Sequence, residues 1–142
     1  MAETKTKILV VEDEEILLTA LSEELKQEGF EVVGAKDGVE GVEKAASDKP
    51  DLILLDLVMP RLDGIGALKQ MKENPDTKEI PVVILTNLSD YDKVSDALSL
   101  GAMDYLVKAN YRLEELVNKI KTVIERKKSG MPSMNPVVPP QA

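Results

Sequence analysis

Residues 52–60 read Leu-Ile-Leu-Leu-Asp-Leu-Val-Met-Pro, an apolar run that stops at an aspartate. A continuous apolar run of this length is typical of a strand that is buried on both faces of a parallel sheet. Met59-Pro60 breaks the chain after the run. The sequence therefore predicts a buried strand at residues 52–55, with Asp56 at its carboxyl end.

Short apolar runs recur along the rest of the chain, and a helical pattern separates each run from the next. This alternation is typical of a parallel sheet covered by helices. The expected strands cover residues 8–11, 32–33, 52–55, 82–85 and 103–107. Five such units with right-handed crossovers predict an α/β, flavodoxin-like doubly wound sheet of five parallel strands, with helices on both faces. Of the two natural strand orders, 2-1-3-4-5 and 3-2-1-4-5, the first suits five strands better.

Particular residues are expected to begin and end the helices. Gly29 and Gly101 suit helix ends, because glycine readily adopts the left-handed backbone of a C-terminal cap. Asp37 is expected to cap the second helix, and either Ser89 or Asp90 the fourth. The inward face of the second helix is expected to hold Val39, Val42 and Ala46.

The 142 residues are enough for one ordinary domain with a single core. We expect this domain to cover residues 7–128, after an N-terminal extension at residues 1–6. Residues 129–142 are rich in proline and lack periodicity, which predicts a flexible tail.

The composition excludes several classes of function. A net charge of −8 repels nucleic-acid phosphates, so direct binding of DNA or RNA is not expected. The absence of Cys and His excludes disulfides, thiolate metal sites and a histidine base. The apolar runs are too short for a signal peptide or a transmembrane helix, so we expect a cytoplasmic protein that does not enter a membrane.

Polar residues stand at the carboxyl ends of four expected strands, where ligands of an open parallel sheet bind. These residues are Glu12, Asp13, Asp56, Thr86 and Lys108. Crowded carboxylates repel one another unless a cation neutralises them or some of them bind protons. Oxygen ligands without His or Cys favour Mg²⁺ or Mn²⁺. A lysine and a threonine can hold the oxygens of a transferring phosphoryl group, and an aspartate can act as its acceptor.

Four segments together resemble the successive motifs of response-regulator receiver domains, and the resemblance runs from about residue 7 to residue 126. The segments are Ile8-Leu-Val-Val-Glu-Asp-Glu14, Asp56-Leu-Val-Met-Pro-Arg-Leu-Asp-Gly64, Ile84-Leu-Thr86 and Gly101-Ala-Met-Asp-Tyr-Leu-Val-Lys108. Each motif alone is weak, but four motifs in this order and at strand ends are specific.

The resemblance implies a role for each matching residue. Asp56 would accept the phosphoryl group and bind Mg²⁺, for which Mn²⁺ would substitute. The other metal ligands would be Asp13, the backbone carbonyl of Val58, and Glu12 through a water molecule. Thr86 and Lys108 would contact the phosphoryl oxygens. Tyr105 would be the aromatic side chain that changes rotamer with Thr86 when the domain switches.

The resemblance also implies partners. The phosphoryl donor would be a histidine kinase or a phosphotransfer protein, and the domain would catalyse only its own phosphorylation and dephosphorylation. The signal would pass to a downstream protein through about residues 90–126. The chain would be a monomer or a dimer that forms on phosphorylation.

Two other functions remain open from the residues alone. A phosphatase of the haloacid dehalogenase type also uses an aspartate nucleophile after a strand, but it typically has a second aspartate two residues later, where this chain has Val58. A binding module of the same fold would not accept phosphate at all. The intact set of Asp56, Thr86 and Lys108 argues against this second alternative.

Overall fold

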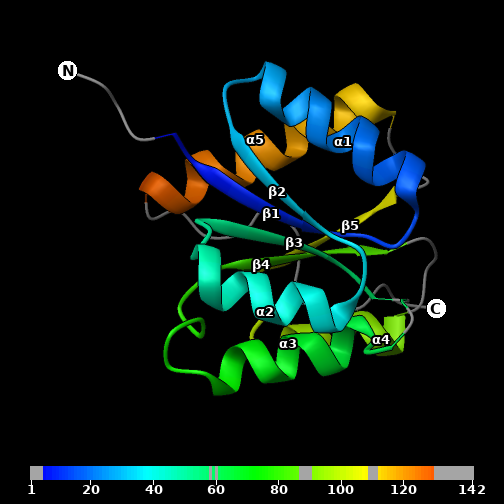
Figure 1. Cartoon of the computed structure of the whole chain (residues 1–142), viewed down its shortest axis with the longest axis vertical. Helices are drawn as coiled ribbons and strands as arrows, with labels where there is room; N and C mark the ends of the chain where they lie inside the picture. The colour runs from blue at the N-terminus through cyan, green and yellow to red at the C-terminus, as the bar shows by residue number, and fades with distance from the viewer. Residues whose placement is uncertain (1–4, 58, 60, 87–90, 109–111, 130–142) are drawn as a thin grey trace.

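The computed structural model describes residues 5–57, 59, 61–86, 91–108 and 112–129 of the chain (Figure 1). Within these residues, strands and helices alternate along the sequence. The strands are β1 (Lys7–Val11), β2 (Glu31–Ala35), β3 (Leu52–Asp56), β4 (Val82–Thr86) and β5 (Asp104–Val107). The helices are α1 (Glu15–Gln27), α2 (Gly38–Asp48), α3 (Gly64–Glu73), α4 (Tyr91–Ser99) and α5 (Leu113–Ser129).

All five strands are parallel and lie in the order β2-β1-β3-β4-β5. Helices α1 and α5 cover one face of the sheet, and α2, α3 and α4 cover the other (Figure 1). Each face has its own apolar core, and the side chains of the central strand β3 alternate between the two: Ile53 and Leu55 on one face, Leu52 and Leu54 on the other. The predicted fold and strand order are therefore confirmed.

The predicted inward face of α2 was right that Val42 packs against the core, but it missed the residues that are buried. The buried residues are Gly38, Gly41 and Ala45, rather than the predicted set of Val39, Val42 and Ala46. At Gly41 a Cβ atom would lie 2.9 Å from both Cγ atoms of Val11. The helix therefore packs on the sheet through its smallest residues, while Val42 lies half-buried beside the contact. A hydrophobicity pattern cannot detect such a contact, because glycine adds little to it.

The helix ends follow the local sequence. Gly29 and Gly101 have φ angles of 97° and 109°, as a left-handed C-terminal cap requires. The side chain of Asp37 accepts a hydrogen bond from the backbone N–H of Glu40, which confirms the predicted N-terminal cap of α2. Ser89 and Asp90 lie outside the described residues, and so does the predicted tail at residues 129–142 except for Ser129, which belongs to α5. No helix in the described ranges is long and apolar enough to span a bilayer.

Candidate functional site

The predicted site residues lie at the carboxyl edge of the sheet. Glu12 and Asp13 directly follow β1, Asp56 ends β3, Thr86 ends β4, and Lys108 directly follows β5. The strands are parallel and in register, so their carboxyl ends meet at one edge. Residues that are up to 96 positions apart in the sequence thus come into contact.

A buried ammonium group bridges two buried carboxylates at this edge. Nζ of Lys108 donates a hydrogen bond of 2.6 Å to Oε1 of Glu12 and one of 3.2 Å to Oδ2 of Asp56. Glu12 is fully buried, Asp56 is 4% exposed, and the Lys108 side chain is 7% exposed. Charge-assisted hydrogen bonds of this kind are stronger than neutral ones, so they fix the lysine over the strand ends.

Three carboxylates form a cluster that is compatible with Mg²⁺. One oxygen each from Glu12, Asp13 and Asp56 lies within 4.8 Å of the others. Asp13 is exposed and the other two residues are buried, so the cluster has one side open to solvent. Hard carboxylate oxygens with an open side suit Mg²⁺, which binds through few protein ligands and keeps several waters.

Burial and charge shift two of the ionisable groups. Burial raises the pKa of the Glu12 carboxyl from 4.5 to about 7, although the hydrogen bond from Lys108 opposes the rise; the negative charge of Asp56 adds to it. Burial alone would lower the pKa of Lys108, but the hydrogen bond and charge of Glu12 and the charge of Asp56 outweigh it and raise the pKa. Lys108 therefore stays positively charged, and the Glu12 carboxyl binds a proton more readily than an ordinary glutamate does.

The remaining predicted residues lie near the same edge. Thr86 is 5% exposed and pairs in register with Val107 of β5. Tyr105 is half-buried and packs against the core on the α2, α3 and α4 face, so it contributes to packing whatever its role in signalling. Val58, whose backbone carbonyl is a predicted metal ligand, lies outside the described residues.

The sequence did not identify two residues that support this edge. The backbone N–H of Glu14 donates to Oε2 of Glu12 at 3.1 Å, and its carboxylate lies 3.8 Å from Nζ of Lys108. The backbone N–H of Gly64 donates to the carbonyl of Leu57 at 2.9 Å. A Cβ atom on Gly64 would lie 2.3 Å from the carbonyl oxygen of Asp56, so only glycine fits there. Glu14 gave no signal that set it apart from its acidic neighbours, whereas the glycine stood within the quoted motif.

A family model described as "Response regulator receiver domain" matches residues 8–121. The chain belongs to this family. It is a receiver domain of the two-component response-regulator type. Such domains are signalling modules rather than classical enzymes, and they interact with histidine kinases.

Curated relatives of this receiver domain include bacterial response regulators. The alkaline phosphatase synthesis transcriptional regulatory protein PhoP of Bacillus subtilis is 40% identical over 128 residues, which are 89% of this chain and 52% of that protein. The response regulator ArlR of Staphylococcus saprophyticus is 43% identical over 122 residues, 85% of this chain and 53% of that protein. The chain thus spans about half the length of these relatives.

Solved structures share the fold over their whole length. The chemotaxis protein CheY4 of Vibrio cholerae superposes with a TM-score of 0.77 at 29% identity, over 84% of this chain and 99% of that one. The phosphorylated cyanobacterial phytochrome response regulator RcpA gives a TM-score of 0.76 at 30% identity, over 93% of this chain and 100% of that one.

Proposed function

We propose that this receiver domain accepts a phosphoryl group on Asp56 from a phosphohistidine donor, with Mg²⁺ bound, and thereby changes its affinity for a protein partner. The observation that carries the proposal is the contact of Lys108 with both Asp56 and Glu12 beside an open carboxylate cluster. This arrangement combines an acceptor oxygen, a fixed positive charge and candidate metal ligands within a few ångströms.

The residues present fit a magnesium site. We assign direct coordination to Asp13 and Asp56 and indirect coordination, through a water molecule, to Glu12. The backbone carbonyl of Val58 is the further ligand that we propose. When bound, Mg²⁺, or Mn²⁺ in its place, would neutralise negative charge on the phosphoryl oxygens.

In the proposed transfer, a carboxylate oxygen of Asp56 attacks the phosphorus of the phosphohistidine. The new O–P bond forms as the N–P bond breaks, and the imidazole nitrogen leaves with the electron pair. Lys108 holds a positive charge 3.2 Å from Oδ2 of Asp56, where it would stabilise charge on the transferring group. The hydroxyl of Thr86, on the neighbouring strand β4, would donate a hydrogen bond to a phosphoryl oxygen.

The proposed response is a shift between two conformations of the domain. A phosphoryl group can shift this equilibrium only through contacts that differ between the two states. We assign that difference to Thr86 and to the side chain of Tyr105, which lies two residues before the strand end on β5. The affected surface would cover residues 90–126, where a downstream protein would bind and where a second copy would bind if phosphorylation causes dimerisation.

We assign the receiver to about residues 7–128; its last helix, α5, ends one residue later, at Ser129. The donor that fits this assignment is a histidine kinase or a phosphotransfer protein. Direct DNA binding by this chain is not part of the proposal, because its net charge of −8 opposes contact with phosphates. The relatives named as transcriptional regulators are longer, since the matched residues cover 52% of one and 57% of another.

The proposal is tested by the chemistry of the adduct. The protein is incubated with acetyl phosphate and Mg²⁺, and half of the sample is then treated with hydroxylamine, which cleaves acyl phosphates. We expect a single phosphate on the peptide that contains Asp56, which hydroxylamine removes. A phosphate that resists hydroxylamine would contradict Asp56 as the acceptor, and no phosphate at all would favour a binding module of the same fold.

A further inference from the structure

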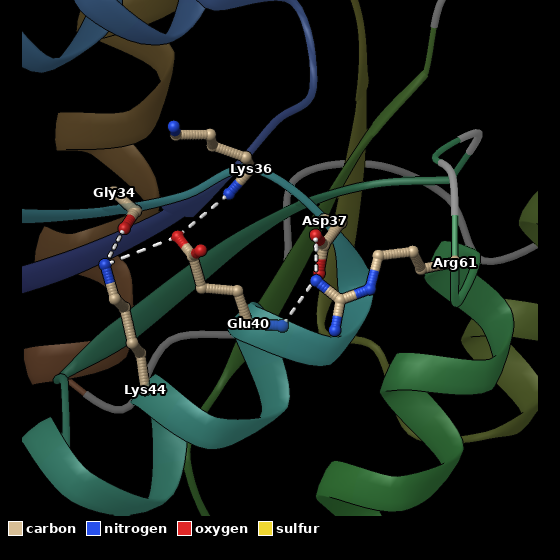
Figure 2. A network of polar contacts seen from close by, with 6 residues as sticks. All are labelled: Gly34, Lys36, Asp37, Glu40, Lys44 and Arg61. Carbon is tan, nitrogen blue, oxygen red and sulfur yellow. Dashed lines mark hydrogen bonds and ion pairs between the residues drawn. The ribbon is translucent and has the colours of Figure 1, made fainter.

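Asp37 and Arg61 connect two loops at the edge of the sheet that carries the site (Figure 2). Asp37 lies between β2 and α2, and Arg61 lies in the loop that leads from Asp56 at the end of β3 to Gly64 at the start of α3. Nη1 of Arg61 donates to Oδ2 of Asp37 at 2.9 Å. The other oxygen of the same carboxylate, Oδ1, accepts from the backbone N–H of Glu40 at 2.8 Å. One buried carboxylate therefore caps a helix and holds the loop.

The backbone of Arg61 supports the view that the loop is held from outside. Its φ angle is 68°, in the left-handed region that residues other than glycine adopt rarely. Such a conformation persists only where the surrounding structure stabilises it. The side chain of Arg61 is 60% exposed, so its pairing with Asp37, rather than burial, is the visible restraint.

The loop also touches α2 through its backbone. A Cβ atom on Gly38 would lie 1.9 Å from the carbonyl oxygen of Leu62, so the first residue of α2 and the loop are in close contact. The hydrogen bond from the backbone N–H of Gly64 to the carbonyl of Leu57, the residue after β3, joins the two ends of the loop. Among the described residues of this segment, Leu62 is thus held against α2 and Gly64 against the end of β3.

The part of α2 that holds the loop is itself fixed to the edge strand. Glu40 accepts a hydrogen bond from the backbone N–H of Lys36 at 3.2 Å, and Lys44 donates one of 2.6 Å to the carbonyl of Gly34 on β2 (Figure 2). Lys44 also lies 3.4 Å from the carboxylate of Glu40. Asp37 therefore stands at the start of a helix that is itself hydrogen-bonded to the end of β2.

We propose that Asp37 and Arg61 are a positioning pair that sets the geometry of the loop after Asp56 and thereby the Mg²⁺ affinity of the site. The inference rests on the proposed function, in which this loop supplies the backbone carbonyl of Val58 to the metal. Mg²⁺ requires nearly ideal octahedral geometry, so a small displacement of a ligand-bearing loop reduces its affinity. Neither residue contacts the metal in this scheme.

A second ion pair of the chain provides a matched control. Lys121 donates a hydrogen bond of 2.6 Å to Glu28, and both side chains are 38% exposed. This pair connects α5 with the end of α1, on the opposite face of the sheet from α2. Exposed ion pairs contribute little to stability, so loss of this control pair should change the melting temperature only slightly.

The test measures the dissociation constant of Mg²⁺ by isothermal titration calorimetry on the full chain, together with the melting temperature without Mg²⁺. Asp37→Asn keeps the helix cap, because its Oδ1 still accepts from Glu40, but it turns an NH₂ group towards Arg61. Arg61→Gln removes the charge from the other partner. Arg61→Lys restores it, and Glu28→Gln is the control.

We expect Asp37→Asn and Arg61→Gln each to weaken Mg²⁺ binding by roughly 5- to 10-fold. Loss of a group that hydrogen-bonds a metal ligand directly typically reduces metal affinity by about 10- to 100-fold, and this pair acts less directly. The double variant should bind no more weakly than either single variant, because both remove one interaction. Arg61→Lys should recover most of the affinity, and Glu28→Gln should match the wild type.

Wild-type affinity in both Asp37→Asn and Arg61→Gln would overturn the positioning role. So would equal losses in the Glu28→Gln control, which would indicate a general effect of charge or stability. The proposed function is tested separately in the same samples: if the wild type binds Mg²⁺ and is phosphorylated on Asp56 while the variants behave like it, only the positioning role fails. If the wild type does not bind Mg²⁺, both proposals fail.

Discussion

Replacing Asp56 with Asn should stabilise the metal-free protein. Asp56 is 4% exposed and lies within 4.8 Å of two other carboxylates, so its charge is held in an unfavourable place. Asn has nearly the same shape and carries no charge. We therefore expect the residue that serves the proposed chemistry to reduce the stability of the fold.

The magnitude follows from the distances. At an effective dielectric constant of about 20, the attraction between Asp56 and Lys108 at 3.2 Å is about 5 kcal/mol. Glu12 has a carboxylate oxygen within 4.8 Å of one of Asp56, and when both groups are ionised their repulsion offsets at least about 3.5 kcal/mol of this attraction. Removing a carboxylate from water costs several kcal/mol more. The balance is unfavourable, and Asp56→Asn should raise the free energy of unfolding by about 1–2 kcal/mol, or roughly 4–8 °C in melting temperature.

Thermal unfolding followed by circular dichroism, with and without Mg²⁺, measures this effect. Asp76→Asn, at an exposed position away from the cluster, is the control for net charge. Mg²⁺ at about 100 times its dissociation constant should stabilise the wild type by about 2.7 kcal/mol and the Asn variant by much less, so the order of stabilities should reverse. An Asp56→Asn variant that is less stable than the wild type without Mg²⁺ would refute this reasoning.

Three further predictions concern the surroundings of the site. Gly64→Ala should destabilise the fold by about 1–3 kcal/mol in calorimetry, because its Cβ atom would lie 2.3 Å from the carbonyl oxygen of Asp56; an unchanged melting temperature would contradict the close contact. Thr86→Ala should leave phosphorylation possible but reduce the NMR shift changes over residues 90–126, and identical shifts in variant and wild type would exclude this coupling route. The backbone N–H of Glu40 holds the pKa of Asp37 below its ordinary value of 3.8, against the effect of burial and with help from the charge of Arg61. A carboxyl with a lowered pKa stabilises the fold above pH 3.8, and this contribution is lost as the pH falls further. The difference in stability between the wild type and Asp37→Asn should therefore shrink in acid unfolding below pH 3.8, and a constant difference would contradict the role of the charge.

The sequence predicted the fold because its signals are local and strong. Continuous apolar runs such as residues 52–55 define buried strands, and Gly29 and Gly101 end helices where the backbone becomes left-handed. The strand ends then predicted which polar residues share an edge, and the structure brings Glu12, Asp56 and Lys108 into contact as expected.

The rest depended on distances that a sequence does not contain. The buried residues of α2 were missed because Gly41, which has no side chain, lies directly against Val11. The partner of Asp37 was missed because a helix cap needs no second partner, and Arg61 lies 24 residues away in a different loop. Such long-range pairs depend on how two loops approach each other, and periodicity does not encode that approach.

The most direct test of the central claim is the intact mass of the protein after incubation with acetyl phosphate. Wild type, Asp56→Asn and Asp63→Asn are compared, each with Mg²⁺ and with an excess of chelator. Asn at position 63 can still cap α3, so this variant controls for loss of a nearby carboxylate. We predict one phosphate adduct in the wild type and in Asp63→Asn with Mg²⁺, and none in Asp56→Asn or with chelator. An adduct of equal yield in Asp56→Asn would contradict the assignment of Asp56 as the phosphoacceptor.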